Sequence, residues 1–498
     1  MCHFLRILAA NLPLVAAASV LGAGSPPSAS RFVPDFRVKS DDYTVLMAAD
    51  GQNPAGAKAF VDDHRRMQMR GWPLGGETRW EVDAAAPGEY AVNVLFQHST
   101  KAALRVSVSV AQSHCLGLSE PDQGHAWRRF TLPGTLKLAK GRNPVVLGIS
   151  AADGTASGEK LEVLSLELVR PEVKVRLHRA AMDLRAQADP EWFRTARYGL
   201  MFHWTSDTVP RHGSPKPYAL AVRDFDLPTF VAQVVQSGAR FVTLTTSHGS
   251  MYFPAPLPTL DRVLPGRTAA RDLVGELAAA LDRHGIRLIL YYHLGSNADK
   301  AWQAASGFWK TDTSEFWRNW TAVITEVGER YGDKLAGWWF DDGTANYYYR
   351  SAPWERLARG AKAGNPKRLI CFNPWILPPA TEFQDYLAGE SFTDPTVKGM
   401  LNAGDGGRIS GGAYAGLQAS SALIMEGGWL HTKRDTQIGA PRYTIEKAAD
   451  LMRRFSALEN ILIFNLEIYQ EGTISPASVE VLRAARDLAF PAAPAGRE

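Results

Sequence analysis

Beyond Pro190, apolar runs of strand length alternate with amphipathic helical segments, a pattern that few folds accommodate. Each apolar run is short enough for a buried strand, and each intervening segment carries apolar residues at helical spacing. The predicted strands are 200–203, 241–245, 288–292, 337–341, 369–372, 385–388, 423–426 and 461–466. Eight such units match the roughly 250 residues of a (β/α)8 barrel, an α/β fold with parallel strands.

A different periodicity occupies residues 41–170, where apolar and polar residues alternate with period two. Turn residues such as Pro87-Gly88 and Pro133-Gly134 separate the runs, which is typical of a β-sandwich. The stretches TRWEVD at 78–83 and GEY at 88–90 resemble carbohydrate-binding modules fused to glycosidases. A domain that only packs on its neighbour is the alternative. We predict a β-sandwich at 31–175 that precedes a catalytic barrel at 176–498.

The first thirty residues have the pattern of a secretory signal peptide. A basic start ending at Arg6 precedes an apolar stretch at 7–21, and small residues follow at 28–30. The stretch is shorter than the ~20 apolar residues that a membrane-spanning helix needs, and a proline interrupts it. We therefore expect a secreted or periplasmic protein with no membrane span.

Charge and motifs exclude several classes of function. Lys and Arg exceed Asp and Glu by four over 498 residues, which argues against a nucleic-acid partner. Two cysteines remain after the signal peptide, Cys115 and Cys371, and we expect buried thiols rather than a disulfide framework. The chain lacks CxxC, HExxH, GxxxxGK[ST], GxSxG and GxGxxG motifs, so we expect neither a metal nor a cofactor.

The polar residues that follow the predicted strands are the candidates for chemistry, because barrel active sites lie at these strand ends. They are His203, Trp204, His248, Tyr292, His293, Asp341, Asp342, Asn373, Trp375, Glu390, Glu426, Trp429, Asn465 and Glu467. Two carboxylates in an aromatic, hydroxyl-binding pocket are what a glycosidase needs. Strand alternation allows only one of Asp341 and Asp342 to enter the barrel mouth beside Trp339, and spacing alone does not say which.

Several of these segments are similar to motifs of the α-L-fucosidases of glycoside hydrolase family 29. RYGLMFHW at 197–204 resembles their first strand, GARFVTLTTSH at 238–248 their second, and RDLV at 271–274 the helix start that follows. WFD at 339–341 resembles the strand that carries their nucleophile, and NILIFN at 460–465 with EGTI at 471–474 their closing strand and turn. The resemblance covers about residues 190–490 and implies a retaining exo-glycosidase that releases terminal α-L-fucose from a glycan.

The resemblance also implies roles for individual residues. Asp341 would be the nucleophile and Glu390 the acid/base, with Glu426 as the reserve acid or, alternatively, a partner of His431 or Arg434. The expected sugar-binding residues are His203, Trp204, Tyr218, His248, Tyr292, Trp339, Asn373 and Trp429.

Three departures from the family pattern bear on the sugar. Gly249 follows His248 where the family usually has a second His, Lys216-Pro217 replaces Glu-Trp, and Asn373 stands near an expected Arg. A glycosidase for L-galactose or L-arabinopyranose is therefore one alternative. A sugar-binding protein that has lost turnover is the other.

Overall fold

The structure is a computed structural model that describes residues 33–62, 65–111, 113–121, 127–154, 160–295, 299–374, 379–391 and 414–491. The predicted signal peptide at 1–30 lies outside these residues. Among the described residues, no helix combines the length and the apolar character that crossing a membrane requires.

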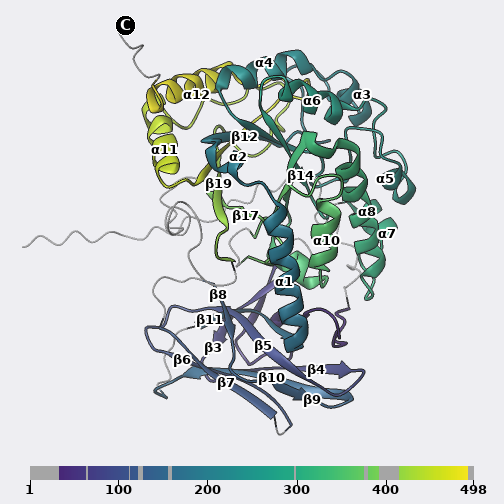
Figure 1. Cartoon of the computed structure of the whole chain (residues 1–498), viewed down its shortest axis with the longest axis vertical. Helices are drawn as coiled ribbons and strands as arrows, with labels where there is room; N and C mark the ends of the chain where they lie inside the picture. Colours follow the sequence, from purple (N-terminus) through teal and green to yellow (C-terminus); the bar gives the residue numbers. More distant parts are fainter. Residues whose placement is uncertain are drawn as a thin grey trace, which may run out of the picture. The chain divides into compact units, whose positions relative to one another are not determined.

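Residues 44–169 form two antiparallel sheets (Figure 1). The larger sheet has the order β2-β3-β11-β5-β8, with β1 paired to β11 and β9 paired to β5; the smaller has the order β4-β10-β6-β7. The strands are β1 (Thr44–Met47), β2 (Lys58–Asp62), β3 (Arg65–Pro73), β4 (Glu77–Ala84), β5 (Gly88–Gln97), β6 (Leu104–Val110), β7 (Ser113–Ser119), β8 (Arg128–Thr131), β9 (Leu136–Leu138), β10 (Gly141–Ala151) and β11 (Lys160–Val169). A short 3-10 turn, Ala48–Asp50, follows β1.

Alternation of side chains builds the core of this sandwich. In β4, Thr78, Trp80 and Val82 are buried while the residues between them are exposed. Their neighbours in register on β10, including Val145 and Leu147, are buried in the same way. The predicted β-sandwich is therefore confirmed.

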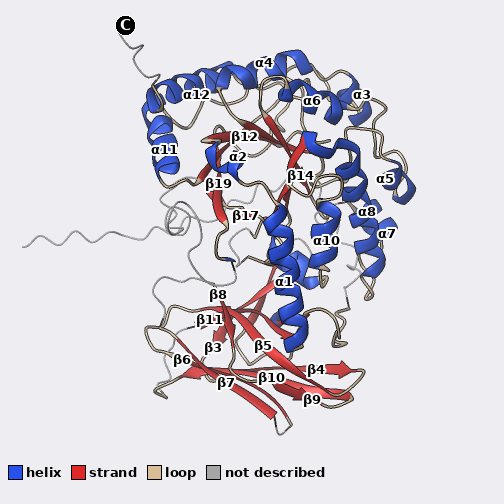
Figure 2. Ribbon diagram, in the orientation of Figure 1, coloured by secondary structure: helices blue, strands red, loops and turns tan. Residues whose placement is uncertain are grey.

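Beyond the sandwich, eight strand positions form a parallel barrel inside a ring of helices (Figure 2). The strands are β12 (Tyr198–Phe202), β13 (Phe241–Thr245), β14 (Arg287–Tyr292), β15 (Leu335–Phe340), β16 (Leu369–Phe372), the short β17 (Tyr386–Leu387) and β18 (Glu390–Ser391), β19 (Gln418–Ile424) and β20 (Ile461–Leu466). They follow the order β16-β15-β14-β13-β12-β20-β19-β17, and β18 also pairs with β19. A hydrogen bond of 2.8 Å from Asp385 N to Ile370 O bridges the side between β16 and β17. The predicted (β/α)8 architecture is confirmed.

The helices are α1 (Pro171–Gln187), α2 (Glu191–Thr195), α3 (Tyr218–Arg223), α4 (Leu227–Ser237), α5 (Pro258–Val263), α6 (Leu273–Asp282), α7 (Lys300–Ser306), α8 (Ser314–Tyr331), α9 (Gly343–Tyr349), α10 (Trp354–Ala361), α11 (Ile445–Ala457) and α12 (Pro476–Ala489), with a 3-10 turn at Gly332–Lys334. Local sequence fixes their ends. Asp226 accepts a hydrogen bond from Thr229 N at the start of α4, and Gly238 ends that helix with a φ of 84°.

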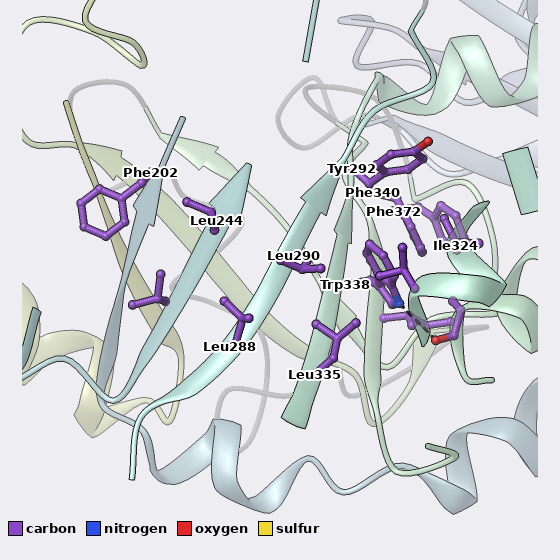
Figure 3. Close-up of a cluster of buried hydrophobic side chains, with 14 of the residues drawn as sticks. Phe202, Leu244, Leu288, Leu290, Tyr292, Ile324, Leu335, Trp338, Phe340 and Phe372 are labelled. Atoms are coloured by element: carbon purple, nitrogen blue, oxygen red, sulfur yellow. Dashed lines mark hydrogen bonds between the residues drawn. The ribbon is translucent and has the colours of Figure 1, made fainter. Parts of the chain in front are cut away.

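Alternation along the barrel strands decides which side chains can reach the active face. Ile289, Tyr291 and Trp339 belong to the cluster inside the barrel. Leu290, Tyr292, Trp338 and Phe340 point outward into the core between strands and helices (Figure 3).

The sandwich and the barrel share buried apolar surface. Four residues of the larger sheet, Met47, Leu95, Leu164 and Val169, belong to the same buried cluster as the outer face of the barrel. Helix α1 contributes to that cluster at helical spacing with Val173, Leu177, Ala181 and Leu184. Residues 32–498 accordingly form one compact unit, and α1 spans the predicted domain boundary at 175/176.

Candidate active site

A pocket of about 150 Å³ lies at the C-terminal ends of the barrel strands. Its lining residues are Met201, His203, His248, Tyr291, Trp339, Asp341, Glu390 and Trp429. The structure thus brings six predicted site residues together. Cys115 and Cys371 are free, buried thiols that do not line this pocket. No group of three His, Cys, Asp or Glu in the described part of the chain is arranged to hold a metal ion.

Asp341 follows β15 directly, and alternation turns it toward the same side as Trp339. Its carboxylate is buried and accepts hydrogen bonds from the Tyr291 hydroxyl and, at 3.0 Å, from Asn373 Nδ2. The next residue, Asp342, is fully buried and accepts a bond of 2.8 Å from Leu294 N. It also lies 2.9 Å from His293 Nδ1. Of the two adjacent acids, Asp341 faces the pocket and Asp342 supports the surrounding backbone.

Asn373 joins the two candidate catalytic acids. Its Nδ2 atom also donates to Glu390 Oε1 at 2.5 Å. Because Asp341 Oδ1 and Glu390 Oε1 contact this single nitrogen at 3.0 and 2.5 Å, they lie no more than 5.5 Å apart. Carboxyl groups about 5–5.5 Å apart are the arrangement of retaining glycosidases, whereas inverting enzymes separate them by about 6.5–9.5 Å.

The electrostatics of the pocket distinguish the two acids. Burial, and then the nearby Asp341 carboxylate, raise the pKa of Glu390 to about 8, against the opposing effect of the Asn373 hydrogen bond. A carboxyl group with such a pKa holds its proton at neutral pH. Glu390 is therefore suited to donate a proton to a leaving oxygen.

His203 has a defined orientation and charge. The Asn465 amide donates to Trp429 O and Gly428 O, so its oxygen faces His203 Nδ1 at 2.8 Å. Burial lowers the pKa of His203 to about 4, so the ring is neutral at physiological pH. With Nδ1–H donating to Asn465, Nε2 is left as an acceptor for a hydroxyl group.

Aromatic rings complete the pocket. The His203 ring lies 5.2 Å from Trp429, 5.0 Å from Tyr291 and 5.7 Å from His248, measured between centroids. Trp339 adds a further indole to the lining. Such walls suit the C–H faces of a sugar ring.

Tyr292 is a correction to the sequence prediction. Its ring points out of the barrel and packs against Trp320 and Trp338, with centroids 5.6 and 6.3 Å away (Figure 3). Tyr291 takes the position in the pocket. The parallel register pairs Tyr291 with Trp339, so both face the same side, and that parity is the signal that could have identified Tyr291.

Trp204 and Tyr218 are also misplaced by the sequence prediction. Trp204 donates from its indole nitrogen to Gln470 O at 3.0 Å, and its ring packs on Tyr218 and Phe225. The Tyr218 ring packs against Tyr252 at a tilt of 41°, with centroids 4.7 Å apart. Both belong to the buried cluster outside the barrel rather than to the pocket lining.

Glu426 does not reach the pocket. Its carboxyl group accepts hydrogen bonds from Glu467 N at 2.9 Å and from the hydroxyl of Ser478 on α12. His431 pairs with Glu467 instead, at 3.2 Å. The reserve acid is therefore turned toward a helix, and neither His431 nor Arg434 is its hydrogen-bond partner.

Comparison with known protein families finds a match over the barrel region of the chain. A model of the alpha-L-fucosidase family matches residues 218–485, more than half of the chain. The chain is similar to tissue alpha-L-fucosidases of Homo sapiens and Mus musculus, at 31% and 30% identity over 141 residues. Each match covers 21% of this chain and 29% or 30% of the relative, so less than a third of the curated relatives' length is matched.

Similar solved structures are fucosidases with low sequence identity. The alpha-L-fucosidase AlfC from Lactobacillus casei in complex with alpha-L-fucose product is 17% identical, with a TM-score of 0.42, over 62% of this chain and 98% of that one. A family 29 alpha-L-fucosidase from Bacteroides thetaiotaomicron is 15% identical, with a TM-score of 0.43, over 59% and 72%.

Proposed function

Because the chain belongs to the alpha-L-fucosidase family, we propose that it is a retaining exo-glycosidase that releases terminal α-L-fucose from glycans. The observation that carries this proposal is the Asn373 amide, which contacts both acids and limits the distance between Asp341 Oδ1 and Glu390 Oε1 to at most 5.5 Å. That separation suits a double displacement through a covalent intermediate.

In the first step, Asp341 attacks the anomeric carbon while Glu390 protonates the departing glycosidic oxygen. The C–O bond to the leaving group breaks as the bond to Asp341 forms, and Glu390 is left as a carboxylate. In the second step, Glu390 removes a proton from water, the water oxygen attacks the anomeric carbon, and Asp341 is released. Each step inverts the anomeric carbon, so the two displacements together leave the product with the substrate's anomeric configuration.

The remaining pocket residues bind the sugar. His203 Nε2 accepts a hydrogen bond from a sugar hydroxyl, and His248 lies beside it to hold another. Trp339 and Trp429 contact the ring faces. The pocket of about 150 Å³ is small beside the roughly 300–1,000 Å³ of sites for drug-sized ligands, which fits a single terminal sugar ring.

A panel of aryl glycosides tests the substrate. We expect hydrolysis of the α-L-fucoside, with the α configuration of the product observed by NMR before mutarotation. Preference for the α-L-galactoside or the α-L-arabinopyranoside would instead identify L-galactose or L-arabinopyranose as the substrate sugar. These alternatives stay open because Tyr218, a predicted sugar-binding residue, lies outside the pocket. Tight sugar binding without turnover of any substrate would instead identify a binding protein.

Replacement of the nucleophile tests the roles. Asp341→Asn removes the attacking charge while keeping the size of the side chain and one of its two acceptor oxygens, so kcat should fall by several orders of magnitude. Circular dichroism and the melting temperature should stay close to those of the parent. Near-normal turnover of Asp341→Asn would reject Asp341 as the nucleophile.

We also propose that the protein is exported, from the basic, apolar and small-residue pattern of its first thirty residues. Expression of the full chain in a bacterium followed by mass spectrometry of the periplasmic fraction should find a chain that starts near residue 31. Recovery of the intact N-terminus from the cytoplasm alone would contradict export.

A further inference from the structure

Arg129, on β8 of the sandwich, lies against loops of the barrel. Its guanidinium donates to the Tyr414 hydroxyl at 2.8 Å, to the Tyr348 hydroxyl and to Ala380 O at 3.2 Å. The Tyr348 hydroxyl also donates to Ala380 O at 2.9 Å, and the Tyr414 hydroxyl donates to Pro379 O at 2.7 Å. One cation thus holds three separate barrel segments in a closed network of hydrogen bonds.

Each of these segments follows a strand that supplies the pocket. Tyr348 lies on α9, which starts two residues after Asp341. Ala380 lies in the connection after Asn373, and Tyr414 precedes β19 in the stretch that follows Glu390. Asp341, Glu390 and the Asn373 amide that links them therefore share one external support.

The sandwich holds Arg129 firmly on its own side. Glu167 on β11 contacts Arg129 Nη2 at 3.2 Å, and the side chain of Glu167 is only 3% exposed. Asn93 on β5 donates to Glu167 at 2.9 Å and accepts a bond from Thr131 at 2.7 Å. Because Asn93 and Thr131 hold the buried Glu167 carboxylate in place, the carboxylate fixes the position of the Arg129 guanidinium.

Short paths lead from the network to the catalytic groups. Tyr347, next to Tyr348 on α9, donates from its hydroxyl to Asp341 O at 3.1 Å. On the other side, Gln384 accepts a bond of 3.2 Å from Phe372 N, the residue before Asn373. Displacement of α9 or of the 379–385 connection would therefore move the carboxylate or the amide that sets the spacing of the acids.

We propose that Arg129 is a positioning residue for the active site, through which the N-terminal sandwich holds Asp341 and Asn373 at their working separation from Glu390. The inference rests on the proposed function and extends it to the sandwich. The sandwich is, on this view, part of the catalytic architecture, whether or not it binds carbohydrate.

The test compares Arg129→Met with Arg128→Met in the full chain. Arg128 lies on the same strand but donates to Glu120 O and Pro121 O within the sandwich, at 2.6 and 3.1 Å. We expect Arg129→Met to lower kcat on the aryl fucoside by ~10- to 100-fold with KM changed less than threefold, as small misplacements of catalytic groups do. Arg128→Met should stay within twofold of the parent.

The pH profile separates positioning from a loss of folded protein. In the parent, kcat/KM should fall at high pH as the acid catalyst loses its proton; we call this fall the basic limb. If the acids drift apart and water enters, the basic limb should move to lower pH by a unit or more in Arg129→Met. A smaller folded fraction would lower the rate at every pH and leave the limb in place. Arg129→Lys keeps the charge but not the planar, multi-donor guanidinium, so it should recover only part of kcat.

Tyr348→Phe gives a second variant that keeps the Arg129–Glu167 pair, and it carries the test if Arg129→Met fails to fold. We expect a fall in kcat of at least fivefold in Tyr348→Phe. Amide hydrogen exchange, which needs no substrate, should be faster across α9 and 379–386 in both variants. Parental kcat, pH limb and exchange in the folded variants would overturn the inference while leaving the proposed function intact. An inactive parent with faster exchange in the variants would overturn the function alone.

Discussion

Burial, and then the Asp341 carboxylate, raise the pKa of Glu390 to about 8. As an acid catalyst Glu390 must be protonated, so kcat/KM should fall as pH rises through about 8. In Glu390→Gln that basic limb should disappear, and an aryl substrate with a highly acidic leaving group should lose far less rate than a methyl glycoside. A limb at about 8 that persists in Glu390→Gln would show that another group is the acid.

Glu426 offers a contrasting prediction about stability. Burial raises its pKa to about 8, from an ordinary value near 4.5. Between these pH values the folded state retains a proton that the unfolded state has released, so the free energy of unfolding falls as pH rises, by up to about 1.4 kcal/mol per pH unit. Glu426→Gln keeps the bonds to Glu467 N and Ser478, so activity should stay within threefold of the parent.

Urea unfolding at several pH values checks this prediction. Between about pH 5 and 8, the free energy of unfolding should fall less steeply with rising pH in Glu426→Gln than in the parent. Loss of activity by orders of magnitude would instead restore Glu426 as a candidate catalytic acid.

For individual residues, the sequence predicts most of the pocket lining correctly. It fails where the alternation of side chains along a strand decides which residue faces the pocket. His203, His248 and Asp341 follow strands and face the pocket, as predicted. The rule that selects the last polar residue of a strand chose Tyr292, although alternation points Tyr291 inward. Neither burial nor register can be read from residue type alone, so the outward turn of Glu426 was also missed.

Among the elements, helices α8 and α10 and strand β15 are held together by one side chain. Arg368 is fully buried and donates to five carbonyl oxygens, those of Gly328, Gly332, Leu335, Ala361 and Ala363, at 2.7–2.9 Å. These carbonyls lie at or near the ends of the three elements, where helical partners run out.

Arg368→Met should therefore destabilise the protein by about 3 kcal/mol or more, because it leaves several buried carbonyl groups without a donor. The matched control is Arg359→Met, which removes an exposed pair with Glu355 on α10 and should change stability by less than about 1 kcal/mol. Chemical denaturation of both variants measures the difference. Equal stabilities would mean that water replaces the guanidinium.

Element types were easier to predict than their ends. The predicted strands 241–245, 369–372 and 461–466 coincide with β13, β16 and β20, because continuous apolar runs mark strands buried on both faces. Strand β19 starts at Gln418, five residues before the predicted start. Its first residues include Ser420 and Ser421, buried polar residues that a hydrophobic pattern does not mark.

For the whole molecule, the shared core makes a prediction about truncation. A chain that starts at residue 176 would expose the surface that packs against Met47, Leu95 and Leu164. Burial of each such side chain is worth roughly 1.5–3 kcal/mol. We expect this chain to be insoluble, or to melt at least about 10 °C below a control that starts at residue 33. An unchanged melting temperature would mean that the barrel folds independently of the sandwich.

The sequence could not reveal this association. Period-two and strand–helix patterns each describe one layer and its own core, so they predict two neighbouring folds. Leu95 on β5 and Leu164 on β11 pack against the barrel cluster, although each lies within a strand of the sandwich. Contacts such as Arg129 with Tyr348 join residues more than two hundred positions apart, and no local pattern encodes them.

The small pocket has a consequence for polymeric substrates. If the chain has the proposed exo-activity, a pocket of about 150 Å³ lined by Met201 and Trp339 should take a chain terminus or a side branch rather than the interior of a backbone. Under the proposed activity, a fucosylated polysaccharide would shed free monosaccharide steadily while its solution kept its viscosity. Reducing sugar would rise with no thinning, the opposite of what an enzyme with an open groove does to the same material.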